Sequence, residues 1–195
     1  MADFYSDSNH HSGKYSKLKK EIFEWLDIAA ISMIAVVLLF TLLFKVVNVT
    51  GSSMEYTYLN NDKVVISKLF YEPKEKDVVV ISRNAYNSPV DDSEEPIIKR
   101  VIATEGQTVD IDFNKGIVYV DGNAISESYI KEKTHRQGDV TFPLTVKKGC
   151  VFVMGDNRNK SLDSRYSEIG QVDKRYILGK AICRIFPFSR FKVLV

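Results

Sequence analysis

The sequence has 195 residues, which suits one globular domain with an appendage. Its 27 Lys and Arg residues nearly balance its 25 Asp and Glu residues, and the formal net charge is +2. Because acidic and basic residues are interleaved, the sequence carries no basic footprint for nucleic acid, and no cluster of His, Cys and carboxylates has the spacing of metal ligands. We therefore expect no nucleic-acid partner, no metal and no cofactor.

The N-terminal part is dominated by an uncharged apolar run, Ile28–Phe44. With its flanks it gives about 20 largely apolar residues, enough for a helix to cross ~30 Å of hydrocarbon. A core helix of a soluble domain would have a polar face, whereas this run contains only Ser32 and Thr41 as polar residues. The sequence therefore predicts one transmembrane helix over residues 21–48.

Lysines are unevenly distributed about this helix. Four of them precede the apolar run: Lys14, Lys17, Lys19 and Lys20. Because fewer lysines follow it, we expect a cytoplasmic tail, residues 1–20, and an extracytoplasmic domain, residues 49–195. A cleaved secretory signal is the alternative, but the apolar core is long for one, and Val47-Asn48-Val49 is a poor cleavage site. We expect an uncleaved single-pass anchor in the cell membrane, with the lipid bilayer as a partner.

Beyond the helix, short apolar segments with strand-like alternation are separated by turn residues. The predicted strands are 64–67, 77–82, 97–103, 108–113, 116–120, 123–126, 151–154 and 178–186. Asp121-Gly122 suits a type I′ hairpin turn, and Arg83–Glu95 and Lys131–Asp139 are predicted to be polar loops. Since no βαβ pattern occurs, the fold class is mostly β, an antiparallel β barrel or sandwich.

Ser53 lies in a Gly-Ser-Ser-Met segment just after the apolar run, where it would be held at a fixed height above a bilayer. A serine hydroxyl is a weak nucleophile at neutral pH and needs a base. Outside the tail the only histidine is His135, in a charged loop, so a Ser-His-Asp triad has little support. Ser53 alone is more often a turn serine.

Lys99 is the best candidate for the base. Lysine can take this role if burial lowers its pKa from about 10.4 toward neutrality, and Lys99 is flanked by apolar residues. Strand alternation would place Lys99 and Val101 on one face and Arg100 on the other. The alternative is that Lys99-Arg100 is a surface pair on an edge strand.

The polar loop Gly155–Arg165 directly follows a predicted apolar strand. Gly155 permits positive φ, and Asp163 can pair with either Arg165 or Arg158. Asp156 and Asn157 can bond backbone amides. This density of complementary groups indicates an ordered loop.

With these motifs the chain resembles the type I signal peptidases, membrane-anchored serine–lysine endopeptidases, in the compact Gram-positive form. The resemblance runs from the anchor to the C-terminus. It rests on Gly51-Ser52-Ser53-Met54 with Thr57, Asp62–Lys68, Lys99–Ile102 with Gly106, Gly116–Glu127, Gly155–Arg165 and Gly179-Lys180-Ala181.

The resemblance implies that Ser53 attacks the scissile carbonyl and that neutral Lys99 takes its proton. Ser161 matches the serine that orients the lysine. The oxyanion would be met by the N–H of Ser53, and at Gly51, where some relatives have a serine, help could come only from backbone.

The resemblance also assigns supporting roles. Asp163 and Arg165 match a structural pair that holds the loop, and Asp156 and Arg158 support it. The implied substrates are exported preproteins, whose signal peptides bind as an added strand with small residues near the cut.

The chain departs from the family pattern at three places. Tyr56 stands where proline is usual, Tyr58 replaces a small or apolar residue, and Ala103–Gln107 replaces a Gly-Leu-Pro-Gly-Asp run. These changes should reshape the rim of the cleft, which is compatible with a narrow substrate set.

Two other functions are open at this point. One is a non-catalytic assembly factor for surface proteins or pili on the same scaffold. The other is a sortase-like transpeptidase that uses Cys150 or Cys183 with His135, although neither cysteine has the expected sequence context. Pairing of the two cysteines and the oligomeric state are left open by the sequence.

Overall fold

The computed structural model describes residues 7–67, 71–85 and 95–193. The chain divides into two compact units, Met1–Leu43 and Phe44–Val195, which are described separately. Of the predicted loop Arg83–Glu95, residues 86–94 lie outside the described residues, and Arg83–Ala85 form a short 3-10 turn, η1.

The first unit contains the helix α1, Asp7–Leu43. Within the described residues, Lys17–Leu43 is the one helical stretch that is long and apolar enough to cross a membrane. The two polar side chains of the uncharged run Ile28–Phe44 bond to carbonyls of their own helix: Ser32 Oγ donates to Ile28 O and Thr41 Oγ1 to Leu38 O. Such internal bonds satisfy hydroxyls that would otherwise be costly in hydrocarbon.

The helix boundaries differ from the prediction at both ends. Helix α1 begins at Asp7, inside the segment expected to be a tail, and it ends at Leu43 rather than at residue 48. Residues Phe44–Asn48 form strand β1 instead, antiparallel to β2 (Lys63–Ser67). The two consecutive valines of this segment, Val46-Val47, favour a strand, and pairing with β2 satisfies its backbone.

The second unit contains two antiparallel sheets, so the predicted mostly β class is confirmed. Among the described residues the larger sheet has the order β1-β2-β11-β3-β4-β9-β10, and β12 pairs with β11. Its remaining strands are β3 (Val78–Ile81), β4 (Ile97–Thr104), β9 (Cys150–Met154), β10 (Val172–Asp173), β11 (Ile177–Phe186) and β12 (Lys192–Val193). Register shifts along β11 let its first half pair with β3 and its second half with β2.

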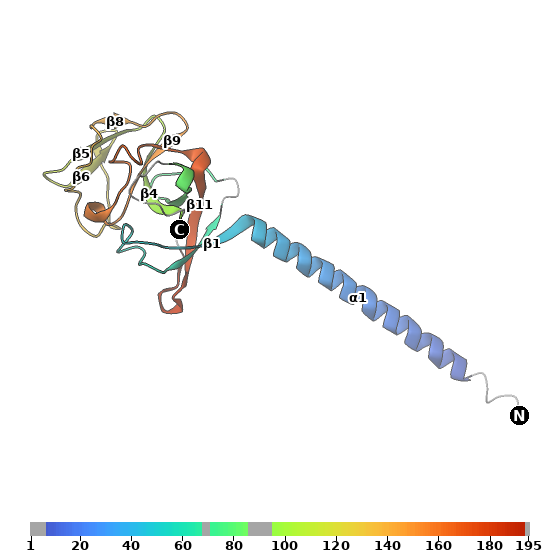
Figure 1. Ribbon diagram of the computed structural model, residues 1–195. Helices are drawn as coiled ribbons and strands as arrows, with labels where there is room; N and C mark the ends of the chain where they lie inside the picture. The colour runs from blue at the N-terminus through green and yellow to red at the C-terminus, as the bar shows by residue number, and fades with distance from the viewer. Residues whose placement is uncertain (1–6, 68–70, 86–94, 194–195) are drawn as a thin grey trace, which may run out of the picture. The chain divides into compact units, whose positions relative to one another are not determined.

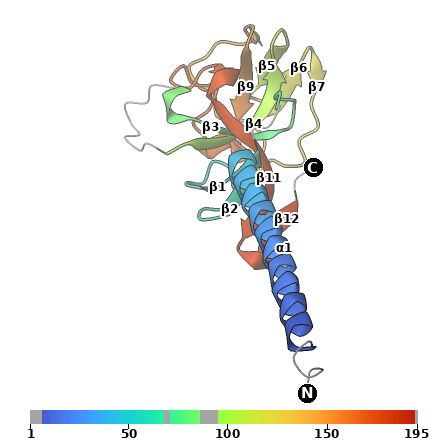
Figure 2. The same ribbon diagram turned by 90° about the vertical axis from the view of Figure 1, so that its right-hand side faces the viewer.

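The smaller sheet has the order β7-β6-β5-β8. Its strands are β5 (Thr108–Asp112), β6 (Ile117–Val120), β7 (Asn123–Ala124) and β8 (Leu144–Thr145). The predicted type I′ turn is confirmed, because Asp121 and Gly122 have φ of 51° and 78°. Strands β5 and β6 lie together at one end of the domain, near β9, in both views (Figure 1, Figure 2).

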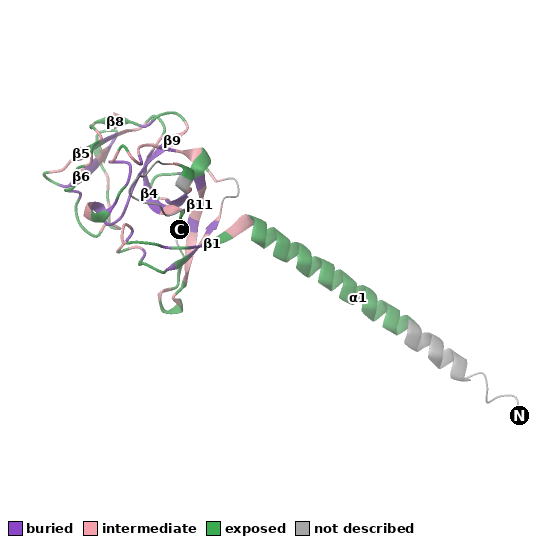
Figure 3. Ribbon diagram, in the orientation of Figure 1, coloured by how far each residue is buried: buried purple, intermediate pink, exposed green. Residues whose placement is uncertain are grey.

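Strand β4 is central to the core of the domain. Ile98 packs in a cluster with Met54 and Tyr58, Val101 in a second cluster with Val153, and Ile102 in a third. Figure 3 shows the buried residues concentrated in β4, β9 and their neighbours. Because β4 lies between β3 and β9, the edge-strand alternative for Lys99-Arg100 is wrong.

Candidate active site

Ser53 is carried by a tight turn between β1 and β2. Gly51 has a φ of +85°, a backbone conformation that favours glycine. The residues that follow anchor the turn, since the side chains of Met54 and Tyr58 are each 1% exposed in the core. Ser53 therefore sits, partly buried, on a turn fixed by packing.

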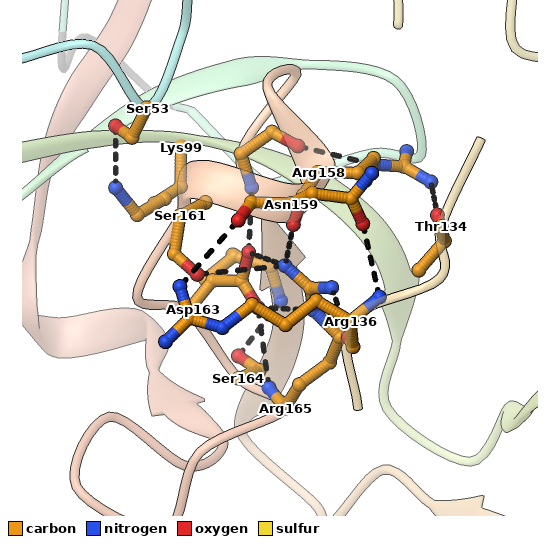
Figure 4. Close-up of polar contacts among 12 residues, drawn as sticks. Ser53, Lys99, Thr134, Arg136, Arg158, Asn159, Ser161, Asp163, Ser164 and Arg165 are labelled. Atoms are coloured by element: carbon orange, nitrogen blue, oxygen red, sulfur yellow. Dashed lines mark hydrogen bonds and ion pairs between the residues drawn. The ribbon is translucent and has the colours of Figure 1, made fainter. Parts of the chain in front are cut away.

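Lys99 reaches this serine from the middle of β4. The predicted burial of Lys99 is confirmed, since the residue is 4% exposed. Its Nζ lies 2.8 Å from Ser53 Oγ, and Figure 4 shows the two side chains pointing toward one another. This distance permits direct proton transfer between the two groups.

Burial shapes the electrostatics of Lys99. Desolvation lowers the pKa of its ammonium from 10.5 to about 8, with the charge of Arg165 acting in the same direction. The carboxylates of Asp163 and Asp156 partly oppose this fall in pKa. A lysine with such a pKa can give up and recover a proton near neutral pH, as a general base must.

The ion pair between Asp163 and Arg165 holds the loop behind Lys99. Arg165 donates from Nε to Oδ1 at 2.8 Å and from an Nη to Oδ2 at 2.9 Å, and both residues are fully buried. Burial alone would raise the pKa of Asp163, but the Arg165 bonds and charge and the Gly155 amide outweigh it and hold the pKa below its ordinary value. Of the two partners open to Asp163 in the sequence, the structure selects Arg165.

Asp156 pairs with Arg100, a residue for which no role was predicted. Two parallel bonds of 2.8 and 2.7 Å join the guanidinium to the carboxylate, and Thr57 Oγ1 also donates to this carboxylate. Arg100 stacks 4.0 Å from the ring centroid of Tyr129. The sequence did contain a signal for this role: Arg100 lies in a strand that is apolar on both faces, which indicates a buried charge that needs a partner.

Arg158 is buried and pairs with Glu127 rather than with Asp163. Its guanidinium also donates to Thr134 Oγ1 at 2.9 Å and to Gly155 O at 3.0 Å. The bond to Thr134 ties the predicted loop 131–139 to the loop that carries Ser161, and Figure 4 shows the Arg158 and Thr134 side chains facing one another.

Ser161 is 1% exposed, and its Oγ has no hydrogen-bond partner in the part of the chain that the structure describes. Its predicted bond to Lys99 is therefore not formed, and the orienting role stays a prediction. A Cβ on Gly155 would lie 2.3 Å from Ser161 Oγ and 2.5 Å from Ser53 O. Only glycine at this position lets the two serines approach so closely.

The backbone of Gly51 was expected to help stabilise the oxyanion, but its N–H is not available for this role. Its N–H donates to Asn60 Oδ1 at 2.9 Å, so this donor is already engaged. The N–H of Ser53, by contrast, has no partner among residues 7–67, 71–85 and 95–193. It is therefore available as a donor beside the Ser53 hydroxyl.

A cavity of about 280 Å³ opens beside the pair. It is lined by Thr50, Gly51, Ser53, Glu95, Pro96, Ile97, Ile98 and Lys99. Its walls thus come from the segments that lead into Ser53 and Lys99. Within the described ranges, no group of three or more His, Cys, Asp or Glu residues is placed to hold a metal, and Cys150 and Cys183 are both free thiols.

Comparison with known proteins identifies similar chains. The family model described as signal peptidase, peptidase S26, matches residues 22–186. Signal peptidase I of Bacillus licheniformis is 30% identical over 189 residues, which cover 92% of this chain and 96% of the relative. Probable signal peptidase I-1 of Synechocystis sp. is 37% identical over 171 residues, 82% of this chain and 81% of the relative. A crystal structure of a signal peptidase I from Enterococcus faecalis V583 is 27% identical, covers 56% of this chain and 97% of its own, and aligns with a TM-score of 0.45.

Proposed function

Because this chain belongs to the signal peptidase family, peptidase S26, we propose that Ser53 and Lys99 are its catalytic pair. The protein is a serine endopeptidase that removes signal peptides from exported preproteins. The observation that carries the residue assignment is the 2.8 Å contact between Ser53 Oγ and the buried Lys99 Nζ. The assembly-factor and sortase-like alternatives are not favoured by the relatives.

In the acylation step, Ser53 Oγ attacks the scissile carbonyl carbon while its proton passes to neutral Lys99 Nζ. The carbonyl oxygen becomes an oxyanion, which the free N–H of Ser53 stabilises. The C–N bond then breaks, and the leaving amine takes the proton from the Lys99 ammonium. The signal peptide is left as an ester on Ser53.

In the deacylation step, neutral Lys99 takes a proton from a water molecule that attacks the ester carbonyl. The tetrahedral intermediate collapses, Ser53 Oγ leaves, and Lys99 returns the proton to it. We assign Ser161 to orient the Lys99 amine, because its hydroxyl is buried beside Gly155, next to the backbone of Ser53. The two ion pairs, Asp163–Arg165 and Asp156–Arg100, hold the loop that supplies this hydroxyl.

The substrate is proposed to bind as an extended strand between the segments that lead to Ser53 and Lys99. The cavity of about 280 Å³ beside these segments would take the side chains that precede the cut. The preference for small residues before the cut is carried over from the resemblance to the family. Tyr56, exposed after the nucleophile at a φ of 92°, is a candidate cause of a narrow substrate range.

We assign residues 1–20 to a cytoplasmic tail, residues 21–43 to the membrane-spanning part of α1, and the unit from Phe44 to an extracytoplasmic catalytic domain. The excess of lysine before the apolar run supports this orientation. A bilayer anchor would confine enzyme and preprotein to one surface and so raise their effective concentration.

The experiment that tests this proposal is cleavage of a model preprotein in liposomes by the full chain and by Ser53→Ala, Lys99→Ala and Ser161→Ala. The proposal predicts cleavage after a small-x-small sequence, no cleavage by the first two variants, and a reduced rate for the third. Exposed Ser126→Ala is the matched control and should cleave normally. Cleavage that survives Lys99→Ala would remove Lys99 from the role of base.

A further inference from the structure

Asn157 makes three hydrogen bonds to the turn that carries Ser53. Its backbone N–H donates to Ser53 O at 2.9 Å. Its side-chain Nδ2 donates to Ser52 O at 3.0 Å and to Glu55 Oε2 at 3.1 Å. Both side-chain partners are acceptors, so the amide nitrogen, and not the oxygen, must face them.

The side chain of Asn157 is held in this orientation at a cost. Asn157 is 0% exposed, and its Oδ1 has no hydrogen-bond partner in the described part of the chain. An unpaired buried acceptor is unfavourable, and native proteins keep few of them. The side-chain amide of Asn157 therefore keeps its nitrogen bonded to Ser52 O and Glu55 Oε2, although this orientation leaves its oxygen unpaired among the described residues.

Because the peptide bond between Ser52 and Ser53 is planar, the direction of the Ser52 carbonyl fixes the direction of the Ser53 N–H. In a trans peptide the C=O and N–H of one unit point in opposite directions. Ser52 O accepts two hydrogen bonds, from Asn157 Nδ2 and, within the turn, from the Glu55 backbone N–H at 3.1 Å. Because Asn157 and Glu55 together hold this carbonyl, the N–H of Ser53 must point away from both donors. This N–H is unpaired in the part of the chain that the structure describes, as an oxyanion donor needs to be.

The direction of the Ser53 N–H matters because the nearby N–H of Gly51 is already hydrogen-bonded. Gly51 has no side-chain donor, and its N–H is bonded to Asn60 Oδ1. The Ser53 N–H is therefore the proposed oxyanion donor whose direction the protein has to fix.

We propose that Asn157 is a positioning residue that aims the Ser53 N–H at the reacting carbonyl by holding the Ser52 carbonyl. This inference rests on the proposed role of Ser53. Asn157 itself does not touch the substrate. Its loss should weaken binding of the transition state while leaving ground-state binding of the signal peptide intact.

The test compares the full chain with Asn157→Ala and Asn157→Leu. Asn159 offers a matched control in the same loop, because its side chain bonds the backbone of His135, Arg136 and Lys133 and does not bond the nucleophile turn. For the Asn157 variants we expect kcat to fall by about 10- to 100-fold, since losing an oxyanion donor costs ~10²–10³ and a misplacement of ~1 Å costs up to ~10². KM should change by less than about threefold. Asn159→Ala should retain kcat.

A second readout separates positioning from general damage. A signal-peptide aldehyde, which adds to Ser53 as a tetrahedral adduct, should bind the Asn157 variants more weakly by about the same factor as kcat falls. The uncleaved signal peptide should bind Ser53→Ala and the double variant Ser53→Ala/Asn157→Ala equally well. Thermal unfolding checks that each variant is folded, and Asn157→Leu, which keeps a similar side-chain volume without a charge or a donor, replaces the alanine variant if that one unfolds.

Unchanged kcat and aldehyde affinity in a folded Asn157 variant would overturn the inference and leave the Ser53–Lys99 pair untouched. A rise in KM alone, or an equal loss in Asn159→Ala, would also overturn it. Failure of the proposed function is distinguishable, because Ser53→Ala would then retain cleavage.

Discussion

Replacing Lys99 with methionine should stabilise the protein while it abolishes cleavage. Burial lowers the pKa of Lys99 from 10.5 to about 8, and at about 1.4 kcal/mol per unit the folded state carries a penalty of about 3 kcal/mol for the charged amine. Methionine has a similar volume and no charge. Losing the hydrogen bond to Ser53 costs about 1 kcal/mol, so the net gain at pH 7 is about 2 kcal/mol.

The gain should depend on pH in a defined direction. Below about pH 8 the amine is charged in both the folded and the unfolded state, and the penalty is complete. Between about 8 and 10.5 only the unfolded state stays charged, so the stability of the wild type rises with pH. The advantage of the Lys99→Met variant must therefore shrink over this range.

Thermal unfolding of the full chain in detergent measures this effect. A gain of about 2 kcal/mol raises Tm by roughly 4–8 °C for a domain of this size at pH 7, and little of the rise should remain at pH 10. Lys148→Met, at an exposed lysine, is the control and should change Tm little at either pH. A loss of stability at pH 7, or a gain that is independent of pH, would refute the desolvation of Lys99.

Three further predictions concern the same site. The value of kcat/KM should rise with pH and level off above about 8 as Lys99 becomes neutral; a rise centred near 6.5, typical of histidine, would contradict this. Arg165→Met leaves the buried Asp163 carboxylate unpaired and should lower the free energy of unfolding by ~3–5 kcal/mol, measured by urea denaturation, where an unchanged midpoint would count against it. Gly155→Ala places a Cβ 2.3 Å from Ser161 Oγ, so the residues around Ser161 must shift. This shift should lower kcat by up to ~10², and an unchanged kcat would contradict the need for glycine at this position.

The sequence predicted those features that local pattern determines. Alternation of apolar residues located β2, β3, β4, β9 and β11, and the apolar surroundings of Lys99 indicated its burial. The Asp-Gly pair fixed the hairpin turn. These signals depend on neighbours in the chain, and a single sequence contains them.

The sequence did not predict which charged partners meet across the fold. Arg100 and Asp156 are separated by 56 positions, and packing of β4 beside β9 decides that they meet. Asn157 reaches back 105 positions to Ser52, again through tertiary contact. The end of α1 was misplaced for a related reason, since a valine-rich segment suits helix or strand until a partner strand is known.

Whether Lys99 activates Ser53 as the nucleophile can be tested by trapping the acyl-enzyme. The full chain is treated with a penem-type acylating inhibitor and digested, and mass spectrometry locates the adduct. If Lys99 is the base, the adduct forms on Ser53 and disappears in Lys99→Ala. An adduct on another residue, or one that forms on Ser53 at the same rate without Lys99, would contradict it.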